Sequence, residues 1–108
     1  MIIKEYVEQN GQSPFARWFE TLESVAAAKV TTALYRLEQG NHSNVKSVGK
    51  GVLEYKVDFG PGYRIYFGKD GLELIILLGG GSKKQQNKDI NIAKQKWDEY
   101  KQRKKRWV

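Results

Sequence analysis

Hydrophobic residues recur at two different spacings along this chain, and the spacing distinguishes the expected helices from the expected strands. Helical spacing predicts one helix that is capped by Ser13, starts at Pro14 and runs to about residue 22. It also predicts a second helix that Ser24 can cap and that ends at Gly40, and a last one that follows Ser82. Their apolar stripes are Phe15, Trp18, Phe19 and Leu22, then Ala26, Val30, Ala33, Leu34 and Leu37, then Ile90, Ala93, Trp97 and Tyr100.

Strands are predicted at the start of the chain and in its second half. A β-prone stretch opens the chain and is broken at Asn10 and Gly11. Apolar and polar residues alternate over 53–58 and over 63–68, and the run over 72–78 is almost entirely apolar. Residues 40–51 are rich in Gly, Ser and Asn, and we expect them to form a loop.

The predicted order of elements is β-α-α-β-β-β-α, without repeats or a linker. This order favours an α+β fold of one domain over residues 1–108, in which a small, mainly antiparallel sheet has its helices packed on one face. The sequence does not decide whether the basic tail, from about 101 to 108, is frayed or folded.

The turn signals also predict a register for the two hairpins. If Gly60-Pro61-Gly62 is a loop, Asp58 pairs with Arg64, and if Lys69-Asp70 is a two-residue turn, Phe67 pairs with Leu72. One face then carries Tyr55, Val57, Ile65, Phe67, Leu72 and Leu74. The other carries Glu54, Lys56, Asp58, Arg64, Tyr66 and Glu73, beside Ile75 and Leu77. We expect the last helix, a partner protein or nucleobases to cover that second face.

Composition removes several classes of function. The chain has no cysteine and one histidine, His42, which excludes disulfides and the usual zinc sites. Its acidic residues are scattered, and Gly79–Lys84 does not match the phosphate loop of nucleotide triphosphatases. No apolar run is long enough for a membrane span and no signal peptide is recognisable, so we expect a cytoplasmic protein with no membrane partner.

The net charge of +7 lies in the last quarter of the chain. Residues 1–82 contain nine Lys or Arg and nine Asp or Glu, whereas residues 83–108 contain ten and three. Positive charge concentrated in this way favours a polyanionic partner, although it also fits a solvated helix face.

A basic and aromatic set remains as the candidate site. Lys56, Arg64 and Tyr66 are expected on one face of the sheet, and Lys83 and Lys84 at the start of the last helix, where free backbone N–H groups favour an anion. Such a set can hold a phosphodiester, and RNA supplies its own nucleophile, the 2′-hydroxyl, so cleavage needs no metal. The residues alone also fit a structural role, in which Arg64 pairs with Asp58, Lys56 pairs with Glu54 or Glu73, and Tyr66 packs in the protein.

Residues 48–94 carry a combination of motifs that resembles a known family. The stretch follows G-V-x-E-x-[KR], then GPGYR-[IV]-YF, then LLGGG-x-K and finally Q-x-x-DI-x-x-AK. This pattern resembles phage-type addiction-module killer proteins, the HigB-like branch of the RelE/ParE toxin superfamily. The resemblance implies a RelE-like fold and a toxin held inactive by an antitoxin, often a helix-turn-helix protein.

The resemblance also implies an activity. Relatives cleave mRNA, many of them on the ribosome, and Arg64 and Lys56 match basic positions of their central strands. We therefore expect a ribosome-dependent mRNA endoribonuclease without metal, cofactor or small-molecule substrate. In it, Arg64 clamps the phosphate, Lys56 assists, Tyr66 stacks or relays a proton, and Lys83, Lys84 and Lys88 bind RNA. The alternatives are a ParE-like gyrase poison and a non-catalytic relative that only binds an antitoxin.

Overall fold

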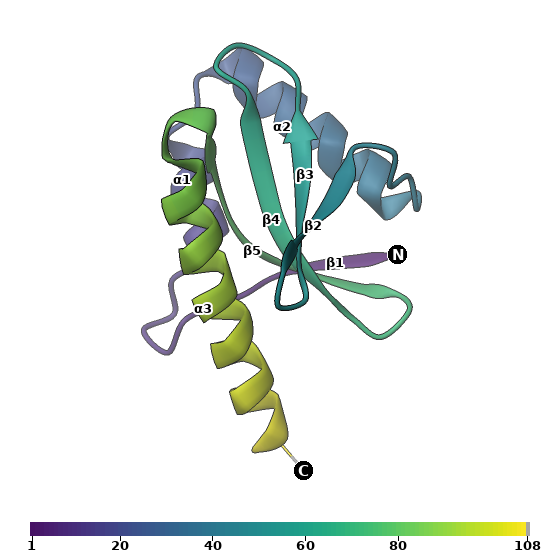
Figure 1. Ribbon diagram of the computed structural model, residues 1–108, viewed down its shortest axis with the longest axis vertical. Coiled ribbons are helices and arrows are strands. Elements are labelled where there is room, and N and C mark those ends of the chain that lie inside the picture. Colours follow the sequence, from purple (N-terminus) through teal and green to yellow (C-terminus); the bar gives the residue numbers. More distant parts are fainter. Residues whose placement is uncertain (108) are drawn as a thin grey trace.

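A computed structural model describes residues 1–107 and contains a five-stranded sheet with helices on both of its faces (Figure 1). The α+β class predicted from the sequence is confirmed. The elements are β1 (Ile2–Glu5), α1 (Pro14–Glu20), α2 (Ser24–Glu38), β2 (Val45–Gly49), β3 (Val52–Val57), β4 (Tyr63–Asp70), β5 (Leu74–Ser82), the 3₁₀ turn η1 (Lys83–Gln85) and α3 (Gln86–Lys105).

The strands lie in the order β1-β5-β4-β3-β2. β1 runs parallel to β5 and every other neighbouring pair is antiparallel, so the sheet is mixed. The predicted loop over 40–51 was wrong in part, because residues 45–49 form β2 against β3. A tight turn joins them, in which Lys50 and Gly51 adopt φ values of 55° and 84°. β2 has five residues and lies at the edge of the sheet, and its two valines, Val45 and Val48, are three positions apart, so it lacks the alternation that identifies a half-buried strand.

Local capping explains where the first two helices begin. The Ser13 hydroxyl accepts a hydrogen bond from the Ala16 N–H at 3.0 Å and Pro14 opens α1, as the sequence predicted. The predicted cap of α2 was wrong, because the carboxylate of Glu23 performs that role instead of Ser24. Glu23 accepts from two backbone N–H groups of the first turn, and a carboxylate also interacts favourably with the helix dipole.

α1 and α2 cover one face of the sheet with apolar side chains. Phe15, Val30 and Leu37 from these helices pack on strand residues that are buried beneath them. The strand residues of this cluster are Tyr55, Val57, Ile65, Phe67, Ile75 and Leu77. The predicted stripes of both helices therefore face the core, and this layer is the larger hydrophobic core of the protein.

α3 covers the opposite face, so the expectation that all helices lie on one face holds only for α1 and α2. Ala93, Trp97 and Tyr100 of its predicted stripe are buried against Tyr6, Val52, Tyr66, Ile76 and Leu78. Glycines make room for the indole: a Cβ added at Gly68 would lie 2.6 Å from the Trp97 ring, and one at Gly51 would lie 2.8 Å from its nitrogen.

Both predicted registers were wrong, with different consequences. In the β3–β4 hairpin Arg64 pairs with Lys56 rather than Asp58, a two-residue slip that keeps every side chain on its predicted face. In the β4–β5 hairpin Phe67 pairs with Leu77 rather than Leu72, an odd shift that reverses β5. β4 continues through Lys69-Asp70, and the turn lies at 71–73. Consequently Ile75 and Leu77 join the core under α1 and α2, whereas Leu72 is 91% exposed.

Within residues 1–107, no helix has both the length and the apolar character that crossing a membrane would require.

Candidate functional site

Four segments of the chain meet where the last helix begins: the end of β3, the start of β4, the end of β5 and η1. In the sheet, Arg64 lies between Lys56 on one neighbour and Gly81 on the other. The Gly62 carbonyl ties the corner together, because it accepts hydrogen bonds from the Lys83 backbone N–H at 2.9 Å and from Arg64 Nη1 at 2.6 Å. The predicted residues Arg64, Lys56 and Lys83 are thereby brought to one place.

Arg64 is buried without an acidic partner. Only 5% of the surface of Arg64 is exposed, and its side-chain Nε is buried with no hydrogen-bond partner. In the part of the chain that the structure describes, none of the ion pairs includes Arg64, so the expected alternative of a pair with Asp58 is not met. A buried guanidinium is costly unless an anion pairs with it. Arg64 is therefore suited to bind an anionic group from outside the chain.

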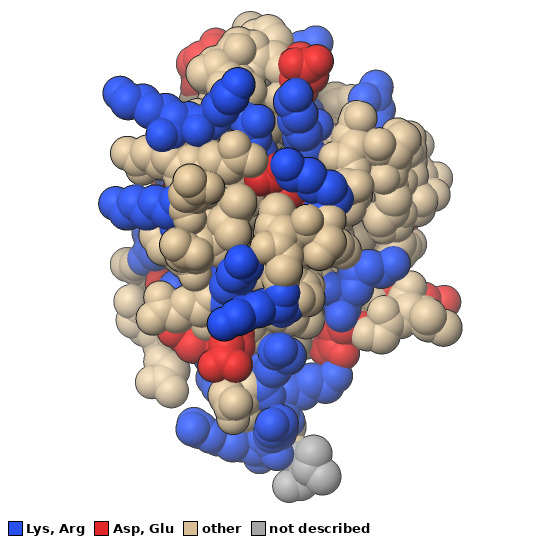
Figure 2. Space-filling model, in the orientation of Figure 1, with Lys and Arg blue, Asp and Glu red and all other residues tan. Residues whose placement is uncertain are grey.

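Exposed lysines surround the buried arginine. Lys56 faces solvent beside it, while Lys83, Lys84 and Lys88 line a shallow hollow along η1 and the first turn of α3. None of the four makes an ion pair within residues 1–107. Figure 2 shows Lys and Arg side chains spread over this face of the molecule, with separate patches of Asp and Glu between them. The corner thus combines one buried cation with several exposed ones.

Tyr66 lies on the same face as Arg64 but beneath α3, with no exposed surface. Its hydroxyl has no hydrogen-bond partner, and its pKa is raised well above its ordinary value, first by burial and then by the nearby Glu54 carboxylate. Glu54 is itself buried, accepts a hydrogen bond from Gln86 Nε2 at 2.9 Å, and lies 3.7 Å from Lys46 Nζ. With its ring covered, Tyr66 has no free face on which a nucleobase can stack.

Asp89 is a site residue that the sequence reasoning missed. Its carboxylate lies directly over Gly81, where an added Cβ would be 1.9 Å from Oδ2. Burial raises the pKa of Asp89, and neighbouring Lys88 opposes that shift. A carboxyl group with a raised pKa is a stronger proton acceptor when ionised. The signal for it was present, since Asp89 belongs to the motif Q-x-x-DI-x-x-AK and Glu54 to G-V-x-E-x-[KR].

The arrangement also explains why glycines occupy the end of β5. Gly81 leaves room for Asp89 on the α3 side, and Gly80 leaves room for Trp18 of α1 on the other side, where an added Cβ would be 2.2 Å from the ring. No cluster of three or more His, Cys, Asp or Glu able to hold a metal ion occurs within residues 1–107.

The chain is similar to a known protein family and to a bacterial protein. The sequence matches the family described as "Phage derived protein Gp49-like (DUF891)" over residues 17–105, a span that contains the whole candidate site. It is 42% identical over 81 residues to a protein of Haemophilus influenzae that is itself described as uncharacterized, and the match covers 74% of this chain and 82% of that relative. The chain belongs to the Gp49-like family, whose members are assigned as RelE-like addiction-module toxins, a kind of protein that is paired with a cognate antitoxin.

Proposed function

We propose that the protein is the toxin of a type II toxin–antitoxin system, of the HigB-like kind, and that it cleaves mRNA on the ribosome without a metal ion. One observation carries this proposal: Arg64 is a buried cation with no acidic partner in the described residues, at a corner where Lys56 and Lys83 also converge. A gyrase-binding surface has no need of a buried, unpaired guanidinium, whereas a phosphodiester supplies the charge that it lacks.

The proposed reaction uses groups already at this corner. The 2′-oxygen of a ribose attacks the adjacent phosphorus, the bond from phosphorus to the 5′-oxygen breaks, and the products are a 2′,3′-cyclic phosphate and a 5′-hydroxyl. Arg64 holds the phosphate oxygens and stabilises the charge that grows on them in the transition state. Asp89 accepts the 2′-hydroxyl proton, and Lys56 donates a proton to the leaving 5′-oxygen.

The remaining predicted residues take supporting roles. Lys83, Lys84 and Lys88 hold the RNA backbone near the start of α3, where the helix N-terminus also favours phosphate. Tyr66 acts as a positioning residue, because its buried ring supports the strand segment that carries Arg64.

Dependence on the ribosome follows from the lack of a side chain at the site that readily exchanges protons at neutral pH. No group at the corner has an ordinary pKa near 7, so a ribosomal group or an enforced mRNA conformation is required to complete the chemistry. The basic last quarter of the chain meets ribosomal RNA through charge. An antitoxin of the helix-turn-helix kind, with an acidic segment, would neutralise the same corner.

The proposal is tested by mapping mRNA ends in cells after brief induction. Wild type is compared with Arg64→Met and with Arg36→Met, which removes an exposed arginine of α2 as a matched control. New 5′ ends inside translated codons, present in wild type and the control but absent in Arg64→Met, are the expected result. Growth arrest with intact mRNA and broken chromosomal DNA would contradict it and support gyrase poisoning instead.

A further inference from the structure

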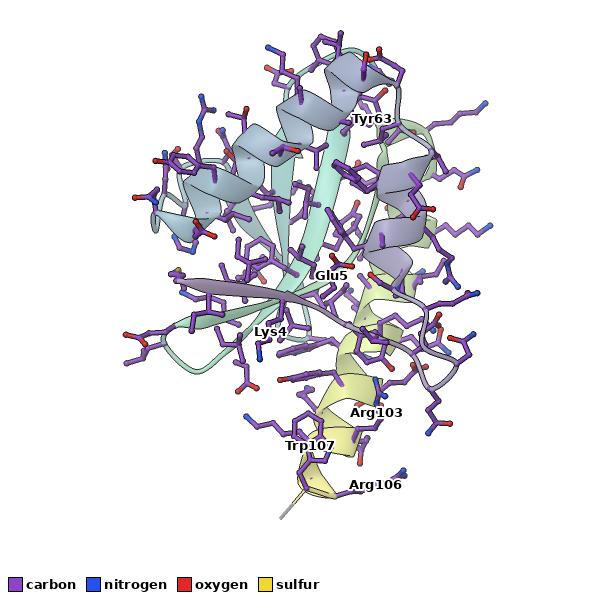
Figure 3. All side chains as sticks on the ribbon, turned by 180° about the vertical axis from the view of Figure 1, so that it is seen from behind. Lys4, Glu5, Tyr63, Arg103, Arg106 and Trp107 are labelled. Carbon is purple, nitrogen blue, oxygen red and sulfur yellow. The ribbon has the colours of Figure 1, made fainter. Side chains whose placement is uncertain are left out.

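The far end of α3 carries a second basic surface that the proposed cleavage site does not use. Five of the seven residues 101–107 are Lys or Arg, and the segment ends at Trp107, which is 68% exposed. A helix of 20 residues is about 30 Å long, so this surface and the cleavage corner lie at opposite ends of α3. Figure 3 shows Arg103, Arg106 and Trp107 together at this end.

Contacts within the protein account for only part of this surface. Arg103 donates to the Val7 carbonyl and lies over the Tyr6 ring, with its guanidinium 4.8 Å from the ring centre, while Lys104 pairs with Asp70. Lys105 and Arg106 make no ion pair among residues 1–107. Cations in the last turn also stabilise a helix end, but that effect does not explain an exposed indole beside them.

The exposed indole is held in a defined position. Its ring meets Tyr100 edge to face, with ring centres 6.1 Å apart and planes at 89°, and Tyr100 stacks in turn on Trp97 at 5.2 Å. The Tyr100 hydroxyl donates a hydrogen bond to Asp70 at 2.6 Å, which anchors these three rings to the sheet. Trp107 is therefore an aromatic platform with cations on the same helix end.

We propose that residues 101–107 form a docking surface for single-stranded or looped RNA, in which Trp107 stacks on a base and Lys105 and Arg106 contact the flanking phosphates. Aromatic rings interleaved with cations are the usual means of binding unpaired nucleotides without sequence preference. A membrane surface fits less well, because Ala93, Trp97 and Tyr100 of α3 are buried, so the helix end offers one ring rather than an apolar face.

This inference goes beyond cleavage, and its test is independent of it. Binding is measured by fluorescence anisotropy with a labelled 2′-O-methyl RNA hairpin that has an unpaired loop. Such RNA cannot be cleaved by 2′-oxygen attack, so binding is read whether or not the protein is a ribonuclease. Trp107→Ala should weaken binding roughly tenfold, whereas Trp107→Phe retains a ring and most of the affinity. Tyr35→Ala, which removes another exposed ring, should have no effect.

The cations are tested through the salt dependence of the same binding. Replacing Lys105 and Arg106 with Gln should reduce the slope of log Kd against log salt by about 1.4. Replacing Arg36 and Lys69 with Gln removes equal charge on the α2 side of the sheet and should leave the slope unchanged. The proposal is overturned if Trp107→Ala binds the hairpin like wild type, if the two charge variants behave alike, or if Trp107→Ala loses binding only to phosphatidylserine vesicles.

Discussion

The two faces of the sheet bury different kinds of residue. Beneath α1 and α2 the buried side chains form one nearly uniform apolar cluster, in which Ile65, Phe67 and Leu77 are fully or almost fully covered. Beneath α3 the hydrophobic cluster occupies the middle of the sheet and is replaced at the start of the helix by the buried charged residues Glu54 and Arg64. The same strands supply both faces, and alternate residues decide which face each side chain joins.

The residues that stabilise the fold are therefore different from those that are available to bind a ligand. On the α1–α2 face the buried core consists of hydrophobic side chains packed on one another. On the α3 face the Arg64 Nε and the Tyr66 hydroxyl are buried without hydrogen bonds. Because unsatisfied buried polar groups reduce stability, their presence at one corner points to a site that an external anion completes.

The largest effect on stability is expected on the α1–α2 face. Phe67 is fully buried, so Phe67→Ala should lower the free energy of unfolding by about 3–5 kcal/mol. Chemical denaturation with urea measures the change. Toxicity should fall only in proportion to the loss of folded protein, and a stable but inactive Phe67→Ala variant would show that the two faces are not separate in function.

Arg64→Met should give the opposite pattern. Removing the group that stabilises the transition state is expected to slow mRNA cleavage about 100-fold to 1,000-fold. Replacing a buried, unpaired charge with an apolar side chain should leave the free energy of unfolding unchanged or higher. Cleavage rates and urea denaturation of the same preparation check both halves. A large loss of stability would instead make Arg64 a structural residue.

Gly81→Ala tests the close approach of α3 to the sheet. The added methyl group would overlap Asp89, and we expect a loss of about 1–3 kcal/mol in the free energy of unfolding. Asp89→Ala should restore most of it in the double variant. Gly80→Ala, which meets Trp18 on the other face, is the matched control, because Asp89→Ala should not rescue it. Equal rescue of both variants would contradict the assignment of these glycines to opposite faces.

The smallest effect on the free energy of unfolding is expected near the C-terminal end of α3, where Asp70 has both an ion-pair and a hydrogen-bond partner. Asp70 pairs with Lys104 and accepts from Tyr100, and these two contacts lower its pKa. A carboxyl whose folded pKa is lowered stabilises the protein above its unfolded pKa, and this contribution is lost as pH falls through the folded pKa. Asp70→Asn should therefore cost about 1 kcal/mol at neutral pH and converge with wild type in acid. A constant difference between the two proteins across that pH range would exclude this ion pair as its cause.

The amino-acid sequence predicted the elements that carry strong periodicity. The stripes of α2 and α3 were correct because Val30, Leu37 and Trp97 recur at helical spacing and are buried. β2 was missed because it is a short edge strand whose two valines do not alternate with polar residues. The face of the sheet to which each β5 side chain points was predicted wrongly, because Lys69-Asp70 has the composition of a turn. In the structure Asp70 pairs with Leu74, so Lys69 and Asp70 both belong to β4.

The sequence indicated the basic and aromatic residues of the candidate site, but not how deeply they are buried. Alternation places Arg64 and Tyr66 on one face, but only the packing of α3 determines that both are covered. Asp89 was overlooked although it belongs to the motif Q-x-x-DI-x-x-AK, because a single aspartate in a basic helix does not indicate burial. Its depth depends on the absence of a side chain at Gly81, a contact between elements that local patterns do not encode.

The most direct test is cleavage of a purified mRNA in a reconstituted translation system. Wild-type protein and Arg64→Met are incubated with the mRNA alone and with the mRNA on translating ribosomes, and the 5′ ends are mapped. We predict cleavage within codons only when wild-type protein and ribosomes are both present, with 5′-hydroxyl ends. Intact mRNA in every reaction, or equal cleavage by Arg64→Met, would contradict the assignment of the Arg64 corner as a ribonuclease site.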